Sequence, residues 1–269
     1  MTVFSPAGRM TRKIGLGLVG VVVLLGLLQI AEGAAGVNQV LFPLPSAVLA
    51  QTWDLISNGS FWSAVGSTLT AWGEAMVFTI IIAVPLGLVL GSVPAVESAL
   101  TPIFEFLRPI PAVVIFPLVL LVARDNTRAQ VSVVVFSSIW PVLINTVYGL
   151  REVDPVAKQT LRSFGFGSLA VALRVSLPSA APFIMTGIRI AASLAFIVTV
   201  AIEIVGTGYS GMGAYASQSQ SSGANITVLL AVAVWAGVLG LLVHGVFSTV
   251  ERRGFRWHQA LRATAAGDM

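Results

Sequence analysis

The sequence predicts an all-α membrane protein with about six transmembrane helices. Hydrophobic residues make up 56% of its 269 residues and charged residues only 10%, and the mean hydropathy is +0.92. Soluble domains are about one quarter charged, so this composition excludes a soluble globular fold. The hydrophobic residues also lie in runs of about 20, the length that an α-helix needs to cross the hydrocarbon core.

The first apolar run, 14–30, follows a short basic arm that contains Arg9, Arg12 and Lys13. Small residues after this run also fit a cleaved signal peptide. The run slightly exceeds the usual signal core and further spans follow it, which favours an uncleaved first transmembrane helix. An amphipathic piece over 46–56 is then expected on the outer membrane surface.

Five further apolar runs predict the remaining spans, over 64–91, 101–122, 131–150, 180–205 and 226–248. The run 101–122 contains four prolines: Pro102, Pro109, Pro111 and Pro117. Such a density is tolerated where neighbouring helices or cavity water satisfy the freed carbonyls, so this span is expected inside the bundle. The segment 206–224, rich in Gly and Ser, is expected to be a loop over the outer mouth.

Basic residues predict the orientation and the organisation of the chain. Most of them lie in the N-terminal arm, the segment 151–178 and the tail, whereas the opposite loops carry only Arg124 and Arg128. By the positive-inside rule, both termini and 151–178 are cytoplasmic. The predicted parts are an arm with the first span and an outer segment, a membrane domain and a basic cytoplasmic tail, over 1–60, 61–250 and 251–269.

The segment 151–178 contains a short polar helix, predicted over 154–165. Asp154 precedes Pro155, which is the pattern of an N-cap followed by proline at the first helical position. Gly165 is expected to end this helix in the left-handed conformation. A capped, charged helix between spans suits docking on a soluble protein, and an interfacial helix without a partner is the alternative.

A second amphipathic segment is expected after this helix, capped by Ser168 and ended by Pro178. Together the two pieces resemble the cytoplasmic motif of bacterial ABC importer membrane subunits, which reads Glu-Ala-Ala, three residues, Gly, nine residues, Ile-x-Leu-Pro. Gly165 and Leu177-Pro178 match at this spacing. The Glu-Ala-Ala positions are held by Gln159, Thr160 and Leu161 instead.

Further segments resemble the branch of these importers that takes up sulfonates, taurine, nitrate and related small molecules. They include LFPLPSAVL (41–49), FLRPIPAVVIFPLVLL (106–121) and PVLINTVYGLREVDP (141–155). The resemblance covers roughly residues 41–250. It implies a type I ABC importer permease fold, with a coupling helix at 154–165 that docks an ATPase subunit.

The resemblance also implies site residues and partners. The ATPase-docking residues would be Lys158, Gln159, Leu161, Arg162, Phe164, Gly165, Leu177 and Pro178. The partners would be an ABC ATPase dimer that binds ATP and Mg, a second permease subunit, expected as a homodimer, and a periplasmic or lipid-anchored solute-binding protein. The location would be the bacterial inner or plasma membrane, with the chain spanning the bilayer several times.

Other functional classes have less support in the sequence. The chain has no P-loop, so energy must come from a partner or from an ion gradient. Without cysteine, and with only His244 and His258, no catalytic, metal or cofactor site is expected. A secondary transporter without an ATPase and a membrane-embedded enzyme remain the alternatives. The basic residues border the apolar runs, so no nucleic acid partner is expected.

Two charged residues in the run 180–205 are candidate translocation-pathway residues, Arg189 and Glu203. Ionisable residues within a span usually face the bundle interior or a water-filled cavity. They are separated by 14 residues, or about 21 Å along a helix, so they cannot pair with each other. Polar contacts between helices are the alternative role for both, and Glu74 is subject to the same two interpretations.

Overall fold

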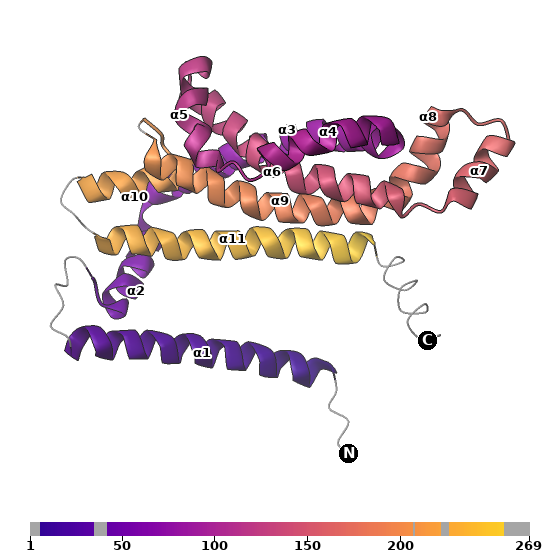
Figure 1. Ribbon diagram of the computed structural model, residues 1–269. Coiled ribbons are helices and arrows are strands. Elements are labelled where there is room, and N and C mark those ends of the chain that lie inside the picture. Colours follow the sequence, from indigo (N-terminus) through magenta and orange to yellow (C-terminus); the bar gives the residue numbers. More distant parts are fainter. Residues whose placement is uncertain (1–5, 35–41, 207, 222–225, 256–269) are drawn as a thin grey trace. The chain divides into compact units, whose positions relative to one another are not determined.

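The computed structural model describes residues 6–34, 42–206, 208–221 and 226–255, and every regular element within them is helical. The predicted tail beyond 255, with Arg256 and Arg262, lies outside the described residues. The helices are α1 (Pro6–Ala34), α2 (Pro45–Asp54), α3 (Gly59–Ser92), α4 (Pro94–Leu107), α5 (Ala112–Ala123), α6 (Asn126–Arg151), α7 (Pro155–Ser163), α8 (Ser168–Val171), α9 (Leu177–Val205), α10 (Met212–Ser221) and α11 (Ile226–Gly254) (Figure 1).

Four of the described helices are long and apolar enough to cross a membrane. They are α3, α6, α11 and the continuous helix Ser168–Val205, which includes α8 and α9. The bent pair α4 and α5 can count as a fifth span, and α1 contains the shorter apolar stretch Gly15–Ala31. The predicted all-α membrane architecture is confirmed.

The single span predicted over 101–122 is replaced by two helices. α4 and α5 meet at an angle of 98°, and Pro109 and Pro111 lie in the break between them. Proline lacks an N–H group to donate to the preceding turn, so two prolines in three residues end α4 here. α5 buries Phe116 but exposes Leu121 and Val122, so only one of its sides faces the interior.

The chain divides into two compact units, one formed by Met1–Trp62 with Ala216–Trp235 and the other by Ser63–Tyr215 with Ala236–Met269. In the first unit, the indole N–H of Trp235 donates to the carbonyl of Thr52 at 3.0 Å. The Trp235 ring also lies 5.3 Å from that of Trp62, centre to centre. These contacts attach the first part of α11 to α2 and to the start of α3.

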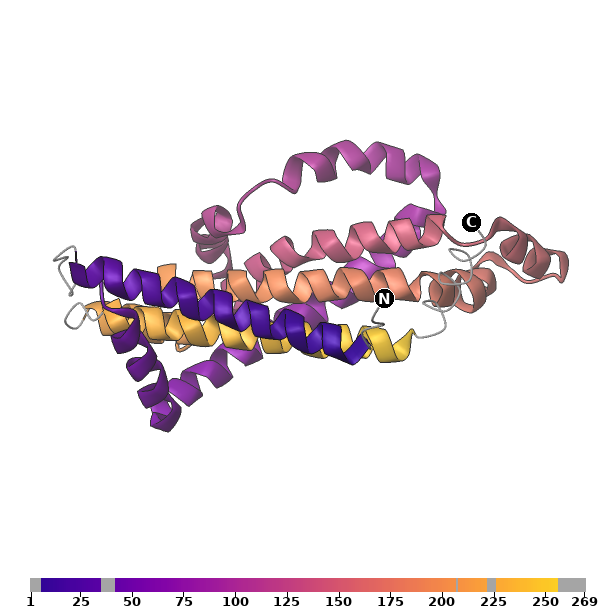
Figure 2. The same cartoon turned by 90° about the horizontal axis from the view of Figure 1, so that it is seen from below.

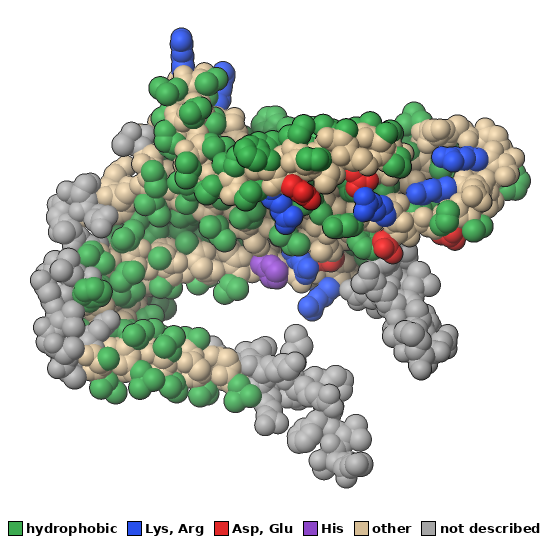
Figure 3. Space-filling view, in the orientation of Figure 1, with side chains coloured by type: hydrophobic (Ala, Val, Ile, Leu, Met, Phe, Trp, Pro, Cys, Tyr) green, Lys and Arg blue, Asp and Glu red, His purple; other side chains and the backbone are tan. Residues whose placement is uncertain are grey.

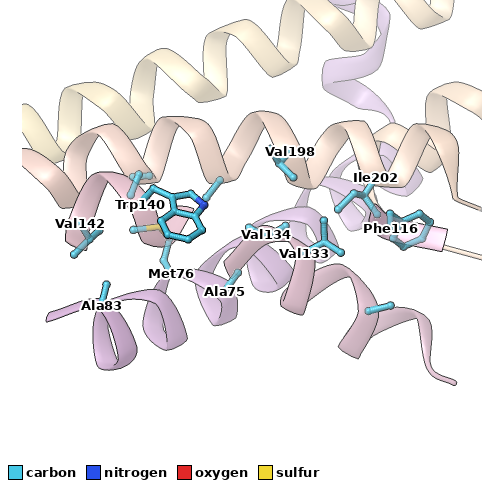
Figure 4. Packing of buried hydrophobic residues seen from close by; sticks show 14 of the residues in the cluster. Ala75, Met76, Ala83, Phe116, Val133, Val134, Trp140, Val142, Val198 and Ile202 are labelled. Atoms are coloured by element: carbon cyan, nitrogen blue, oxygen red, sulfur yellow. The ribbon is translucent and has the colours of Figure 1, made fainter. Parts of the chain in front are cut away.

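The second unit is built around α6 and α9, which pack along one another. Buried side chains from α3 join them, and Met76, Val142 and Val198 show the three helices meeting (Figure 4). Gly187 allows the close approach of α9, because a Cβ atom there would lie 2.8 Å from the carbonyl oxygen of Pro141. Small residues of this kind let transmembrane helices come into backbone contact.

The close contact at Gly187 generates a stability prediction. Gly187→Ala should lower the free energy of unfolding by about 1–3 kcal/mol, since the added methyl group overpacks α6 against α9. Gly245→Ala is the matched control, because no described atom lies within 4 Å of its added Cβ. Thermal unfolding of the purified protein, followed by tryptophan fluorescence, measures both, and equal transition temperatures would contradict this packing.

Candidate functional site

The helix predicted over 154–165 is α7, and its two ends are confirmed. The Asp154 side chain accepts a hydrogen bond of 2.8 Å from the amide of Val156, and Pro155 is the first helical residue. At the other end Gly165 has a φ of 82°. A side chain is disfavoured in this left-handed conformation, which is why glycine ends the helix.

α7 presents one face to the rest of its unit and the other to its surroundings. Leu161 is half-buried, whereas Val156 and Phe164 are 63% and 77% exposed. Gln159 and Arg162 are exposed on the same helix. The predicted docking residues therefore differ in exposure, and Phe164 is the exposed apolar residue among them.

Lys158 has a partner within the chain. Its ammonium group donates to the carbonyl oxygen of Leu150 at 3.1 Å, close to the C-terminal end of α6. A cation at a helix C-terminus satisfies a free carbonyl and complements the helix dipole. Lys158 therefore attaches α7 to α6, a contact that sequence spacing did not indicate.

The segment after α7 differs from its prediction. Gly167, not Ser168, is the N-cap of α8, and the helix does not end at Pro178. A π-helical stretch, Ala172–Ser176, runs directly into α9. Its wider turn accommodates the proline, which has no N–H to donate to the preceding turn. Leu177 packs on the buried residues Leu150 and Ala180 instead of facing outwards.

α7 and α8 project beyond the ends of α6 and α9, as both ribbon views show (Figures 1 and 2). Basic and hydrophobic side chains gather over this projection (Figure 3). Phe166 lies there under the Arg174 guanidinium, whose central carbon is 4.9 Å from the ring centre. Leu169 and Leu173 are 74% and 54% exposed. The projection thus combines exposed apolar side chains with positive charge.

At the opposite end of the same unit, Glu203 is almost completely buried and fully hydrogen-bonded. Its side chain is 1% exposed. One carboxyl oxygen accepts from the Thr68 hydroxyl at 2.8 Å and from the amide of Gly213 at 3.1 Å. The other accepts from the Gln130 side-chain amide at 3.1 Å. One side chain of α9 therefore joins α3, α6 and the start of α10.

These contacts explain why α10 forms where a loop was expected over 206–224. The first amides of a helix lack partners within the helix. Here the amide of Met212 donates to the Thr68 hydroxyl at 2.8 Å and that of Gly213 to Glu203. A carboxyl group at a helix N-terminus is also favoured by the helix dipole. The helix is capped by distant side chains, which composition cannot reveal; residues 222–225 lie outside the described part.

Gly211 is required at the turn before α10. A Cβ atom on it would lie 2.0 Å from the carboxyl carbon of Glu203, so any other residue would displace that group. The neighbouring Tyr209 hydroxyl donates to the carbonyl of Asn126 at 2.9 Å. Burial and, to a smaller extent, the Asp125 and Glu203 carboxyl groups together raise the pKa of Tyr209 to about 12, so the hydroxyl remains a donor at neutral pH.

Arg189, the second predicted pathway residue, forms an ion pair between helices. Its Nε atom lies 3.3 Å from a carboxyl oxygen of Glu251 on α11. The Thr186 hydroxyl donates to the other oxygen of Glu251 at 2.8 Å. The structure thus brings Arg189 into a contact between α9 and α11, and it does not bring Arg189 and Glu203 together.

A polar cavity of about 470 Å³ lies beside the Glu203 cluster. Its walls come from the first turns of α3, the start of α6 and the residues before α10, and they include Ser67, Thr70, Glu74, Asn126, Thr127 and Ser210. Sequence reasoning singled out Glu74 but not the hydroxyl residues around it. Within the described residues, no group of three or more His, Cys, Asp or Glu side chains could hold a metal ion.

Comparison with known proteins identifies a family and relatives. Residues 83–255 match the family described as binding-protein-dependent transport system inner membrane component. The nitrate import permease protein NrtB of Leptolyngbya laminosa is 30% identical over 241 residues, 86% of this chain and 84% of that protein. The bicarbonate transport system permease protein CmpB of Synechococcus elongatus is 29% identical over 197 residues, 73% of this chain and 70% of that protein.

Among solved structures, a bacterial alginate ABC transporter in complex with an alginate-pentasaccharide-bound periplasmic protein contains a similar chain. The similarity has a TM-score of 0.64 at 14% identity and covers 91% of this chain and 96% of that chain. At this identity the likeness shows the fold, which is that of type I ABC importer permeases.

The Glu203 cluster generates a second prediction. Glu203→Ala should lower the free energy of unfolding by at least about 3 kcal/mol, because it leaves several buried donors without an acceptor. Glu105→Ala, which removes an exposed carboxyl group from α4, is the control. Hydrogen exchange at the amides of 212 and 213 provides the local measurement, and unchanged exchange in Glu203→Ala would refute the capping role.

Proposed function

The chain belongs to the family of binding-protein-dependent transport system inner membrane components, and we propose that it forms the translocation pathway for a small solute. It is a membrane-spanning permease subunit of an ABC importer. In the proposed system an extracytoplasmic binding protein delivers the solute, and a partner ATPase that binds ATP and Mg drives its passage. The family description and the alginate transporter with its periplasmic protein support this arrangement.

The main support for an ATPase partner is the exposed face of α7. A Phe side chain that is 77% exposed beside Arg162 and Gln159 on a well-capped helix has no role in packing its own unit. Interfaces commonly place an aromatic anchor in a pocket of the partner and surround it with polar rim residues. Phe164 would be this anchor, and Arg162 and Gln159 would belong to the rim.

The connections of α7 suggest how movement of the ATPase reaches the membrane. α7 follows α6 directly and is attached to its end by Lys158. On its other side, α8 continues through the π-helical stretch into α9. Because α6 and α9 pack closely at Gly187, displacement of α7 would move them as one body. Closure of the ATPase dimer would then open the pathway alternately to the two sides of the membrane.

The remaining parts of the proposal concern assembly and solute. A second permease subunit, most simply another copy of this chain, would complete the pathway. The α7 end would face the cytoplasm in the bacterial plasma membrane, as the predicted charge distribution requires. The solute would be a small molecule of the sulfonate, taurine or nitrate type or a related compound, a range that the names of the nitrate and bicarbonate relatives support.

Disrupting the exposed face of α7 tests the ATPase partner. The double variant Arg162→Glu with Phe164→Ala should abolish co-purification with the ATPase and ATP-driven uptake, because it removes the anchor and reverses the rim charge. A matched control is Arg128→Glu with Phe106→Ala, whose side chains are 81% and 73% exposed away from α7. The control should assemble normally.

Unchanged assembly of the α7 variant would refute the docking role. Uptake by the chain alone, without ATP, would refute the importer mechanism and favour a secondary transporter.

A further inference from the structure

We infer that the polar cavity beside Glu203 binds solutes that carry a protonated amine or amidine, and that Glu74 sets this preference. As a statement about the transported solute, this rests on the proposed function and narrows its solute class. The argument depends on which hydrogen-bonding groups of the cavity wall are still available to a ligand.

Several of the hydrogen-bond donors around the cavity are already used within the chain. The Ser67 and Thr70 hydroxyls donate to the carbonyls of Ser63 and Gly66, at 3.2 and 2.8 Å. Each hydroxyl has a single proton, so its remaining capacity is to accept. These two residues therefore offer oxygen lone pairs to a molecule in the cavity.

Two further side chains beside the cavity, Gln130 and Tyr209, also donate within the chain. The Gln130 amide donates to Glu203 at 3.1 Å and to the carbonyl of Thr199 at 3.5 Å. The Tyr209 hydroxyl donates to the carbonyl of Asn126. These donors are engaged, so an anion would have to use the remaining hydroxyls, such as those of Thr127 and Ser210.

Glu74 adds a negative charge to this acceptor-rich wall. Within the described part of the chain its carboxyl group has no hydrogen-bond or ion-pair partner. The described residues that line the cavity include no Lys, Arg or His. Arg128, the residue after Thr127, lines a neighbouring pocket with Glu74, but it is 81% exposed and pairs with Asp125 at 3.4 Å.

Charge and hydrogen bonding therefore favour the same ligand chemistry. Ammonium and amidinium groups carry positive charge and only donors, which complements a wall of acceptors with one free carboxylate. Inorganic anions such as nitrate meet repulsion from Glu74. A volume of about 470 Å³ lies in the range of small-molecule sites. Among the solute types proposed above, those with an amino group fit and simple anions do not.

Three probes of equal shape and different charge test this inference. Benzamidine is a cation at neutral pH, benzamide is neutral and benzoate is an anion. Saturation-transfer NMR on the full chain in phosphatidylcholine nanodiscs, with empty nanodiscs as reference, measures their binding. Benzamidine should bind most tightly and benzoate most weakly.

Single substitutions test whether Glu74 causes the preference for benzamidine. Glu74→Gln should weaken benzamidine binding by about fivefold, as for loss of a partly exposed ion pair, and leave benzamide unchanged. Glu105→Gln removes an exposed carboxyl group elsewhere and should change nothing. Tightest binding of benzoate, or benzamidine binding that is unaffected by Glu74→Gln, would overturn the inference.

The ATPase is absent from this measurement, so its outcome is separable from that of the proposed function. If the ATPase co-purifies and benzoate binds most tightly, only the present inference fails. If the ATPase does not co-purify while benzamidine binding depends on Glu74, the importer proposal fails and the charge preference of the cavity is supported.

Discussion

The buried carboxyl group of Glu203 is the constraint on which one end of the membrane domain depends. A carboxyl group that is 1% exposed is costly in a low-dielectric interior unless donors surround it. Thr68, Gln130 and the amide of Gly213 supply those donors. The same contacts fix the start of α10, and they engage the side-chain amide of Gln130, which lines the polar cavity. Stability at this end and the chemistry offered to a solute are therefore linked through Gln130.

At the opposite end of the unit, the connections of α7 would make it move together with α6 and α9. α7 is joined to α6 through Lys158, and residues 164–167 connect it to the uninterrupted helix Ser168–Val205 that contains α9. A force on the exposed face of α7 would be transmitted through elements whose contacts are backbone-close, as at Gly187. The ion pair of Arg189 with Glu251 adds α11 to this group. In the proposed mechanism, a rigid α7 end and a hydrogen-bonded Glu203 end would let one subunit take part in alternating access.

Local backbone structure was predictable from the sequence where a few neighbouring residues determine it. The cap at Asp154 and the left-handed Gly165 depend on a few adjacent residues, and both are confirmed. The apolar runs likewise predicted the long membrane helices α3, α6, α9 and α11, but not the break that divides 101–122 between α4 and α5. Tertiary contacts decided the remainder. α10 forms because Thr68 and Glu203 cap it from far away in the sequence, and Pro178 is absorbed by a π-helical stretch. For Arg189, composition could not distinguish a pathway residue from an ion pair with α11.

The claim that α7 is the contact with the ATPase can be tested directly, because the chain contains no cysteine. A single cysteine is introduced as Gln159→Cys on the exposed side of α7, or as Arg128→Cys at the opposite end, and is labelled with benzophenone maleimide. After illumination of membranes that contain the candidate ATPase, the Gln159→Cys chain should form a covalent adduct with it and the Arg128→Cys chain should not. An active complex that gives equal adducts from both positions, or none from Gln159→Cys, would contradict the account.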